Sequence, residues 1–216
     1  MKVCTDSCML GAWTALRAGG LKRILDIGTG TALLPLMLAQ KSDARIDAIE
    51  WDPESCAQAK ENILQSPWAG RIQILEGDAR YYSFPDAYDF IITNPPFFES
   101  DLHSPELKKN RAKHEESLTM EELIAVIKSS LHAEGVFSIL LPFHRTGYFE
   151  KLADTNGFFL REKLTIKQTP SHAAFRSIAL FGNRKPGQVI SNEMSIKNTE
   201  GKNSFEFVEL MKDFYG

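Results

Sequence analysis

Cysteine, long apolar runs and net charge are all scarce in this sequence, and each shortage excludes a class of protein. The three cysteines form no CxxC pair and lack histidines at metal-binding spacing, so neither a disulfide framework nor a structural metal is predicted. No apolar run approaches the roughly 18 residues of a membrane-spanning helix, and residues 1–5 do not begin a signal peptide. We therefore expect a reduced, cytoplasmic protein without a membrane segment or a metal, and we expect it to act as a monomer.

The net charge of −3 argues against a protein that coats nucleic acid non-specifically. Basic residues are nevertheless concentrated in two segments. Residues 103–114 carry four basic residues against one acidic residue, and residues 160–186 carry six against one. Charge runs are usually solvated surface, but here they lie on either side of a candidate catalytic turn. The pattern is compatible with a compact RNA-binding surface.

The order of apolar segments predicts one α/β domain spanning residues 1–216. The chain is 43% hydrophobic, long enough for a full core, and has no repeat or linker that would mark a second domain. The expected strands are residues 23–27, 45–50, 72–75, 89–93, 136–141, 160–168 and 174–182, and the expected helices are residues 5–18, 31–40, 53–65, 119–131 and 146–156. This alternation predicts a Rossmann-like, seven-stranded, mostly parallel sheet with right-handed crossovers and an antiparallel hairpin at one edge.

Four polar residues fall at or just after the carboxyl ends of expected strands, where sheets of this kind bind ligands. They are Asp26, Glu50, Asp78 and Asn94. A glycine-rich turn follows the first of these strands, where Gly28 and Gly30 permit a tight bend and close backbone approach to a ligand. Dinucleotide enzymes use a similar turn, but Ala32 or Leu33 stands where their third glycine would pack. The sequence therefore favours a ligand without a pyrophosphate.

These strand ends suit the separate parts of S-adenosylmethionine. The carboxylate of Glu50 would accept both ribose hydroxyls, although a surface glutamate at a strand end is the plainer interpretation. Asp78 is placed to accept from the adenine amino group or, alternatively, to cap a loop turn. Trp51 would stack on the adenine, and a packed core tryptophan is an equally good interpretation. The predicted cofactor-binding residues are Thr5, Asp26, Gly28, Gly30, Glu50, Trp51, Asp78, Ala79 and Asn94.

The segment from Ile91 to Phe97 is predicted to be a buried strand that ends in an Asn-Pro-Pro-aromatic turn. Two consecutive prolines fix two φ angles and remove two N–H donors, so the turn is stiff and its carbonyls are free. The carbonyl oxygens of Asn94 and Pro95 would accept the two N–H groups of a planar amine, while Phe97 stacks on the attached base. These bonds keep the nitrogen lone pair available for in-line attack on a methyl group, so positioning supplies most of the rate. The alternative is a proline-rich turn with a packed phenylalanine.

Six short segments spread over almost the whole chain are typical of one enzyme family. They are MKVCTD (1–6), LGAW (10–13), DIGTG (26–30), NPPF (94–97), RAKH (111–114) and KDFY (212–215). With them the sequence resembles the tRNA1(Val) adenine-37 N6-methyltransferases, within the class I S-adenosylmethionine-dependent enzymes. The resemblance implies N6 methylation of the adenine just 3′ of the anticodon in a valine tRNA. Cys4 and Ser7 depart from it, because glycines are expected there, and an aromatic-rich basic segment is expected upstream of Met1.

The residues expected to bind the RNA follow the catalytic turn closely. They are Lys108, Lys109, Arg111, Lys113 and His114. Two other enzyme classes share the turn: ribosomal RNA guanine-N2 methyltransferases, which generally have a duplicated domain, and protein-glutamine methyltransferases, which usually have tyrosine in place of Phe97 and a helical amino-terminal domain. An inactive cofactor-binding or RNA-binding module is a further alternative, but such a module has no use for Asn94.

Overall fold

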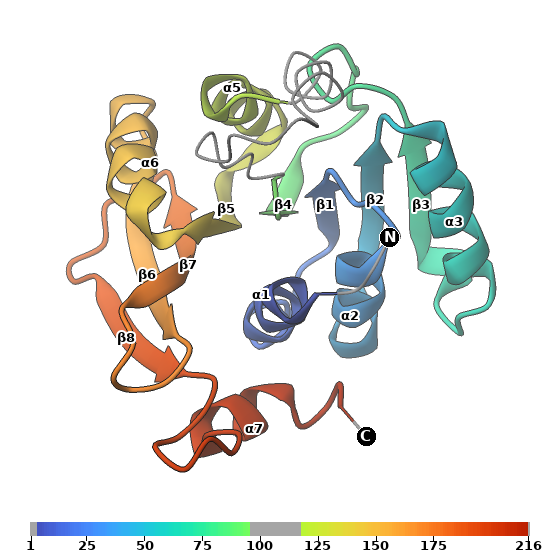
Figure 1. Cartoon of the computed structure of the whole chain (residues 1–216). Helices are drawn as coiled ribbons and strands as arrows, with labels where there is room; N and C mark the ends of the chain where they lie inside the picture. The colour runs from blue at the N-terminus through green and yellow to red at the C-terminus, as the bar shows by residue number, and fades with distance from the viewer. Residues whose placement is uncertain (1–3, 96–117, 216) are drawn as a thin grey trace, which may run out of the picture.

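The computed structural model describes residues 4–95 and 118–215, which form a central β-sheet with helices on both faces (Figure 1). In chain order the elements are α1 (Thr5–Ala15), β1 (Arg23–Ile27), α2 (Leu33–Lys41), β2 (Arg45–Glu50), α3 (Pro53–Leu64), the short 3-10 helix η1 (Ala69–Arg71), β3 (Ile72–Glu76), β4 (Tyr88–Thr93), α5 (Met120–Ser130), β5 (Leu131–Pro142), α6 (Phe143–Thr155), β6 (Phe159–Lys167), β7 (Ala174–Gly182), β8 (Ile190–Ser195) and α7 (Phe205–Met211). Of the helices in these ranges, none is long and apolar enough to cross a membrane.

The described strands form one eight-stranded sheet in the order β3-β2-β1-β4-β5-β7-β6-β8. The first five of these strands are mutually parallel, and β7 runs antiparallel to both β5 and β6. The predicted fold class, a mostly parallel α/β sheet with an antiparallel hairpin, is confirmed. The strand order reverses between β1 and β4, and such a reversal opens a crevice for ligands at the carboxyl ends of the strands.

Two elements near the carboxyl end of the chain are absent from the sequence-based prediction. β8 pairs in parallel with β6 at the sheet edge, so the predicted number of seven strands is one too low. Only Met194 of β8 is buried, and the strand therefore lacks the apolar alternation that identifies a half-buried strand. The sequence of α7 does contain helix signals, because Ser204 caps its first turn and the buried Phe207 and Met211 lie four residues apart.

Alternating side chains of the central strands supply two separate cores. In β4, Phe90 and Ile92 join the core that contains residues of α1, α2, α3 and α7, whereas Ile91 joins the core that contains residues of α5 and α6. β1 lies between β2 and β4 and is buried from Ile24 to Ile27, as expected for a central parallel strand. Burial on both faces gives the residues at the carboxyl end of β1 a fixed position.

Capping residues define where two of the helices begin. The Asp52 carboxylate accepts a hydrogen bond from the backbone N–H of Ser55 at 2.8 Å, and Pro53 occupies the first turn of α3. Thr119 and Glu122 form a reciprocal capping box at the start of α5. Both helix starts are confirmed as the sequence predicted them, because capping depends on neighbouring residues alone.

Gly11 allows α1 to pack closely against α2. A Cβ at this position would lie 2.5 Å from the Sδ of the buried Met37 and 3.3 Å from a methyl carbon of Leu34. We expect Gly11→Ala to lower the free energy of unfolding, measured in urea, by about 1 kcal/mol. Displacing core side chains destabilises a protein by roughly 1–3 kcal/mol. Replacing glycine by alanine within a helix stabilises it by only about 1 kcal/mol.

Gly147 of α6 is the matched control, because a Cβ there would meet nothing within 4 Å. Gly147→Ala should raise the free energy of unfolding by about 0.5–1 kcal/mol through helix propensity alone. If both substitutions stabilise the protein equally, Met37 moves aside without cost and the close packing of α1 on α2 is not a constraint.

Candidate functional site

The carboxyl ends of β3, β2, β1 and β4 meet at one edge of the sheet. In the observed register, Ile27 of β1 lies beside Ile49 of β2 and Thr93 of β4, and Glu50 of β2 lies beside Glu76 of β3. The polar residues that the sequence placed at these four strand ends therefore gather along one edge. The chemical role assigned to each of them stays a prediction.

The loop after β1 contains three residues in the left-handed backbone region: Gly28 (φ 75°), Gly30 (φ 57°) and Ala32 (φ 65°). The N–H of Gly28 donates to the carbonyl of Ile49 at 3.0 Å and fastens the loop to the end of β2. A Cβ at Gly28 would meet nothing within 4 Å, so the glycine borders open space. α2 begins at Leu33, two residues later than predicted, because the left-handed Ala32 interrupts the helix.

Asp26 is a fully buried carboxyl group without a hydrogen bond from any described residue. Burial raises its pKa to about 7, and the nearby Glu50 carboxylate adds to the increase. The neighbouring Thr29 hydroxyl lowers the pKa, but it does not reach hydrogen-bonding geometry. A buried acid normally has a hydrogen-bonding or charged partner. The buried Asp26 carboxyl group, two residues before Gly28, would therefore gain from a cationic partner such as the ammonium group of an amino acid.

This raised pKa predicts that the stability of the unliganded protein depends on pH. The unfolded chain ionises Asp26 near pH 3.8, whereas the folded chain keeps it protonated up to about pH 7. The stabilising contribution of protonated Asp26 is thus complete below the pKa that it has in the unfolded chain. It is lost as pH rises through the pKa that it has in the folded chain. One pKa unit corresponds to about 1.4 kcal/mol.

We therefore expect the native protein to lose up to about 4 kcal/mol of unfolding free energy between about pH 4 and about pH 8, relative to Asp26→Asn. The variant removes the titrating group and keeps the side-chain shape. The pH dependence that comes from other titrating groups is then the same in both proteins and cancels in the comparison. Urea unfolding of both proteins across this pH range makes the test. Parallel stability profiles would mean that Asp26 has an ordinary pKa in the folded chain.

Glu50 is buried at the end of β2 and is held by backbone N–H groups. Its Oε2 accepts from Gly30 at 2.9 Å, and its Oε1 accepts from Trp51 and Asp52 at 3.0 Å each. A carboxylate has about four acceptor positions, so about one remains for a ligand, fewer than the two ribose bonds expected from the sequence. The Trp51 side chain is 48% exposed, so the interpretation as a packed core residue is wrong and its ring is accessible for stacking.

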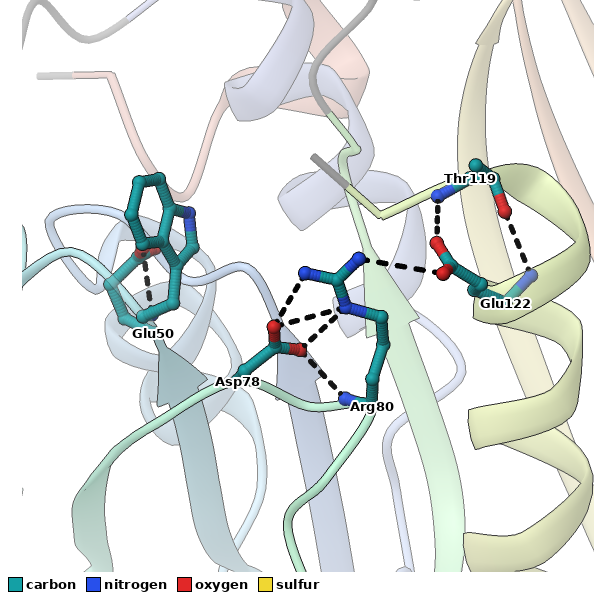
Figure 2. Close-up of polar contacts among 6 residues, drawn as sticks. Glu50, Asp78, Arg80, Thr119 and Glu122 are labelled. Atoms are coloured by element: carbon teal, nitrogen blue, oxygen red, sulfur yellow. Dashed lines mark hydrogen bonds and ion pairs between the residues drawn. The ribbon is translucent and has the colours of Figure 1, made fainter. Parts of the chain in front are cut away.

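Asp78 is bound by Arg80, a contact that the sequence analysis did not include (Figure 2). The carboxylate accepts from the Arg80 Nη2 at 2.6 Å and from its Nε at 3.0 Å, and this guanidinium holds the pKa of Asp78 below its usual range. Arg80 also reaches Glu122, whose carboxylate belongs to the capping box with Thr119 at the start of α5 (Figure 2). Ala79, beside Asp78, packs against the core on the α5 and α6 face.

Asn94 follows β4 directly and contacts the first turn of α1. Its Nδ2 donates to the Oγ of Ser7 at 2.7 Å, and that hydroxyl also lies 3.1 Å from the Sγ of Cys4. The Asn94 carbonyl oxygen accepts no hydrogen bond from any residue that the structure describes, so it is available to accept from a ligand. The contact joins residues 87 positions apart, so no local pattern in the sequence indicates it. Pro95, next in the chain, is partly buried.

Thr5, another predicted cofactor residue, is exposed at the start of α1. It lines a depression of about 470 Å³ together with Gln168, Lys197 and Tyr215. None of the residues at the ends of β1 to β4 lines this depression, so the role of Thr5 stays a prediction. Among residues 4–95 and 118–215, no group of three or more histidine, cysteine or acidic side chains is arranged to hold a metal ion.

Six predicted site residues lie outside the described ranges. They are Phe97, Lys108, Lys109, Arg111, Lys113 and His114. The second basic segment, residues 160–186, is described, and four of its cations form ion pairs: Lys163 with Glu150, Lys167 with Glu193, Arg176 with Asp6 and Arg184 with Glu134. These pairs neutralise most of its positive charge, which weakens its interpretation as an RNA-binding surface.

Comparison with solved structures identifies the architecture. A predicted O-methyltransferase from Agrobacterium tumefaciens is similar with a TM-score of 0.70 at 19% identity, and the match covers 95% of each chain. A putative class I S-adenosylmethionine-dependent methyltransferase from Listeria monocytogenes has a TM-score of 0.63 at 16% identity, covering 90% of this chain and 68% of that one. At such low identity these likenesses show the fold, which is that of class I methyltransferases.

Sequence comparison identifies the family. The methyltransferase small domain model matches residues 13–160. The tRNA1(Val) (adenine(37)-N6)-methyltransferase of Dyadobacter fermentans is 42% identical over 219 residues, and that of Bacteroides thetaiotaomicron is 37% identical over 217 residues. Each match covers 100% of this chain and 90% of the relative. The chain therefore belongs to the tRNA1(Val) (adenine(37)-N6)-methyltransferase family, and its cofactor is S-adenosylmethionine.

Proposed function

We propose that this chain transfers a methyl group from S-adenosylmethionine to N6 of adenine 37 in tRNA1(Val). It does so in the cytoplasm, as a monomer in which residues 1–216 act as one methyltransferase domain. The observation that supports the proposal most strongly is the position of Asn94 and Pro95 directly after the central strand β4, in a chain 42% identical over its full length to an enzyme of that name.

The strand ends around β1 fit the cofactor. S-adenosylmethionine, when bound, supplies a methyl group activated by a positively charged sulfur. The buried, unpartnered carboxyl group of Asp26 would ionise and pair with the cationic amino-acid end, and Gly28 carries no side chain that would obstruct close approach. Glu50 would use its remaining acceptor position for a ribose hydroxyl, and the exposed Trp51 ring and the Asp78 carboxylate would bind the adenine.

Asn94 would orient the target amine. With Ser7 accepting from Nδ2, the Asn94 carbonyl oxygen accepts one N–H of the adenine amino group, and the Pro95 carbonyl accepts the other. These bonds oppose delocalisation of the nitrogen lone pair into the ring, so the nitrogen is nucleophilic without prior deprotonation. After attack the methylated amine is cationic and loses a proton to solvent. Phe97 would stack on the flipped adenine.

The proposal is tested with purified protein, labelled S-adenosylmethionine and an unmodified tRNA1(Val) transcript, followed by mass spectrometry of the nucleosides. We expect N6-methyladenosine in this transcript and none when adenine 37 is replaced by guanine. Equal methylation of the two transcripts would place the target elsewhere in the tRNA. Appearance of N2-methylguanosine would favour the guanine-N2 class of enzyme, and no methylated nucleoside in either transcript would contradict a tRNA substrate.

A further inference from the structure

We propose that Arg80 is a positioning residue for cofactor recognition, which holds the Asp78 carboxylate in the orientation that accepts the adenine amino group. The inference rests on the proposed function in one respect, the assignment of Asp78 to the adenine. It adds a residue that selects a 6-aminopurine through its effect on Asp78 and without direct contact with the ligand.

The contact between Arg80 and Asp78 has the geometry of a fork. The Nε of Arg80 lies 3.0 Å from both carboxylate oxygens, and Nη2 lies 2.6 Å from Oδ2. The backbone N–H of Arg80 also donates to Oδ1 at 2.9 Å. Two parallel bonds from a planar guanidinium fix the plane of a carboxylate as well as its position. The loop and the side chain thus define one orientation of Asp78.

The opposite side of the guanidinium is anchored to α5. Nη1 of Arg80 lies 3.4 Å from Oε1 of Glu122, and the other oxygen of Glu122 accepts from the backbone N–H of Thr119 at 2.8 Å (Figure 2). The Thr119 hydroxyl in turn accepts from the backbone N–H of Glu122 at 3.1 Å. Glu122 is itself held by the helix cap, so this longer contact adds a secondary support to an orientation that the fork to Asp78 already defines.

The remaining acceptor capacity of Asp78 matches a single amine hydrogen. Three N–H groups of Arg80 make four contacts with the carboxylate, because Nε is shared between its two oxygens. A carboxylate offers about four acceptor positions, so three donor groups leave room for about one more. The Asp78 side chain is still 30% exposed, so its unused lone pair is accessible at the ligand edge of the sheet. An oriented acceptor favours an amino group and disfavours a ligand that presents no donor at that position.

The experiment compares two ligands by calorimetry: S-adenosylhomocysteine and its analogue with unsubstituted purine in place of adenine. For the native protein we expect at least tenfold tighter binding of the adenine ligand, since a hydrogen bond to a charged group contributes roughly tenfold or more. In Arg80→Ala this ratio should fall to about threefold or less. Arg80→Lys keeps the charge but has no planar fork, so its ratio should be intermediate.

Glu122→Gln is the matched control, because it weakens the outer contact and leaves the fork to Asp78 in place. Its ratio should stay within about twofold of the native value. Thermal unfolding without ligand checks that each variant is folded, and Arg80→Lys preserves the test if Arg80→Ala does not fold.

Two results would overturn the proposal. An unchanged ratio in Arg80→Ala would make the pair a surface ion pair without a role in recognition. Tighter adenine binding and a larger ratio in that variant would show that Arg80 competes with the ligand for Asp78. Neither ligand carries a transferable methyl group and no RNA is present, so these results are independent of whether adenine 37 of tRNA1(Val) is the methyl acceptor.

Discussion

Asn94→Ala is expected to lower the rate of methyl transfer by about 10²-fold or more while changing the dissociation constant of S-adenosylmethionine by less than about threefold. The substitution removes the carbonyl oxygen that orients the target amine, and loss of one preorganised polar group at a reaction centre costs roughly this factor. The substitution leaves in place the cofactor contacts proposed for the ends of β1, β2 and β3. A radiolabel transfer assay and calorimetry measure the two quantities separately.

Two further variants sharpen this test. Asn94→Asp keeps an acceptor oxygen at the same position and should retain more activity than alanine. Asn156→Ala is the control and should leave the rate unchanged, because among the described residues this side chain donates to the Leu152 carbonyl at the end of α6 alone. Near-normal turnover by Asn94→Ala would contradict the mechanism, and the turn would then be a structural feature only.

Glu50→Ala is expected to raise the dissociation constant of S-adenosylmethionine by at least about tenfold, through loss of a charge-assisted bond to the ribose. It should also lower the free energy of unfolding by about 1–3 kcal/mol, because the N–H groups of Gly30, Trp51 and Asp52 lose their acceptor. Calorimetry measures the dissociation constant, and urea unfolding measures the free energy of unfolding. The two effects are separable because only the first depends on the ligand.

Glu76→Ala is the control for Glu50→Ala. Glu76 occupies the matching register position on β3, but its carboxylate pairs with Lys60 at the surface, where both side chains are about half exposed. Glu76→Ala should change the dissociation constant and the free energy of unfolding little, since surface ion pairs contribute roughly 0–1 kcal/mol. If Glu50→Ala lowers stability and leaves the dissociation constant unchanged, Glu50 shapes the glycine turn and does not bind the ribose.

Much of the fold was predictable because the relevant signals are local. The apolar run ending at Thr93, the capping box at Thr119 and the Asp52-Pro53 helix start each depend on neighbouring residues. β8 was not predictable in this way. Its residues are mostly exposed, so its strand conformation depends on pairing with the edge of β6 and not on its own pattern.

The sequence by itself determined which polar residues stand at strand ends, since strand, turn and glycine spacing place Asp26, Glu50 and Asn94 there. Only the tertiary structure decided what those residues contact. It aligned β1 with β2 and β4, which brought Gly30 to Glu50, and it packed α1 so that Ser7 meets Asn94. Strand order and helix packing are set by burial of the whole core, so contacts between residues distant in the chain have no local signature.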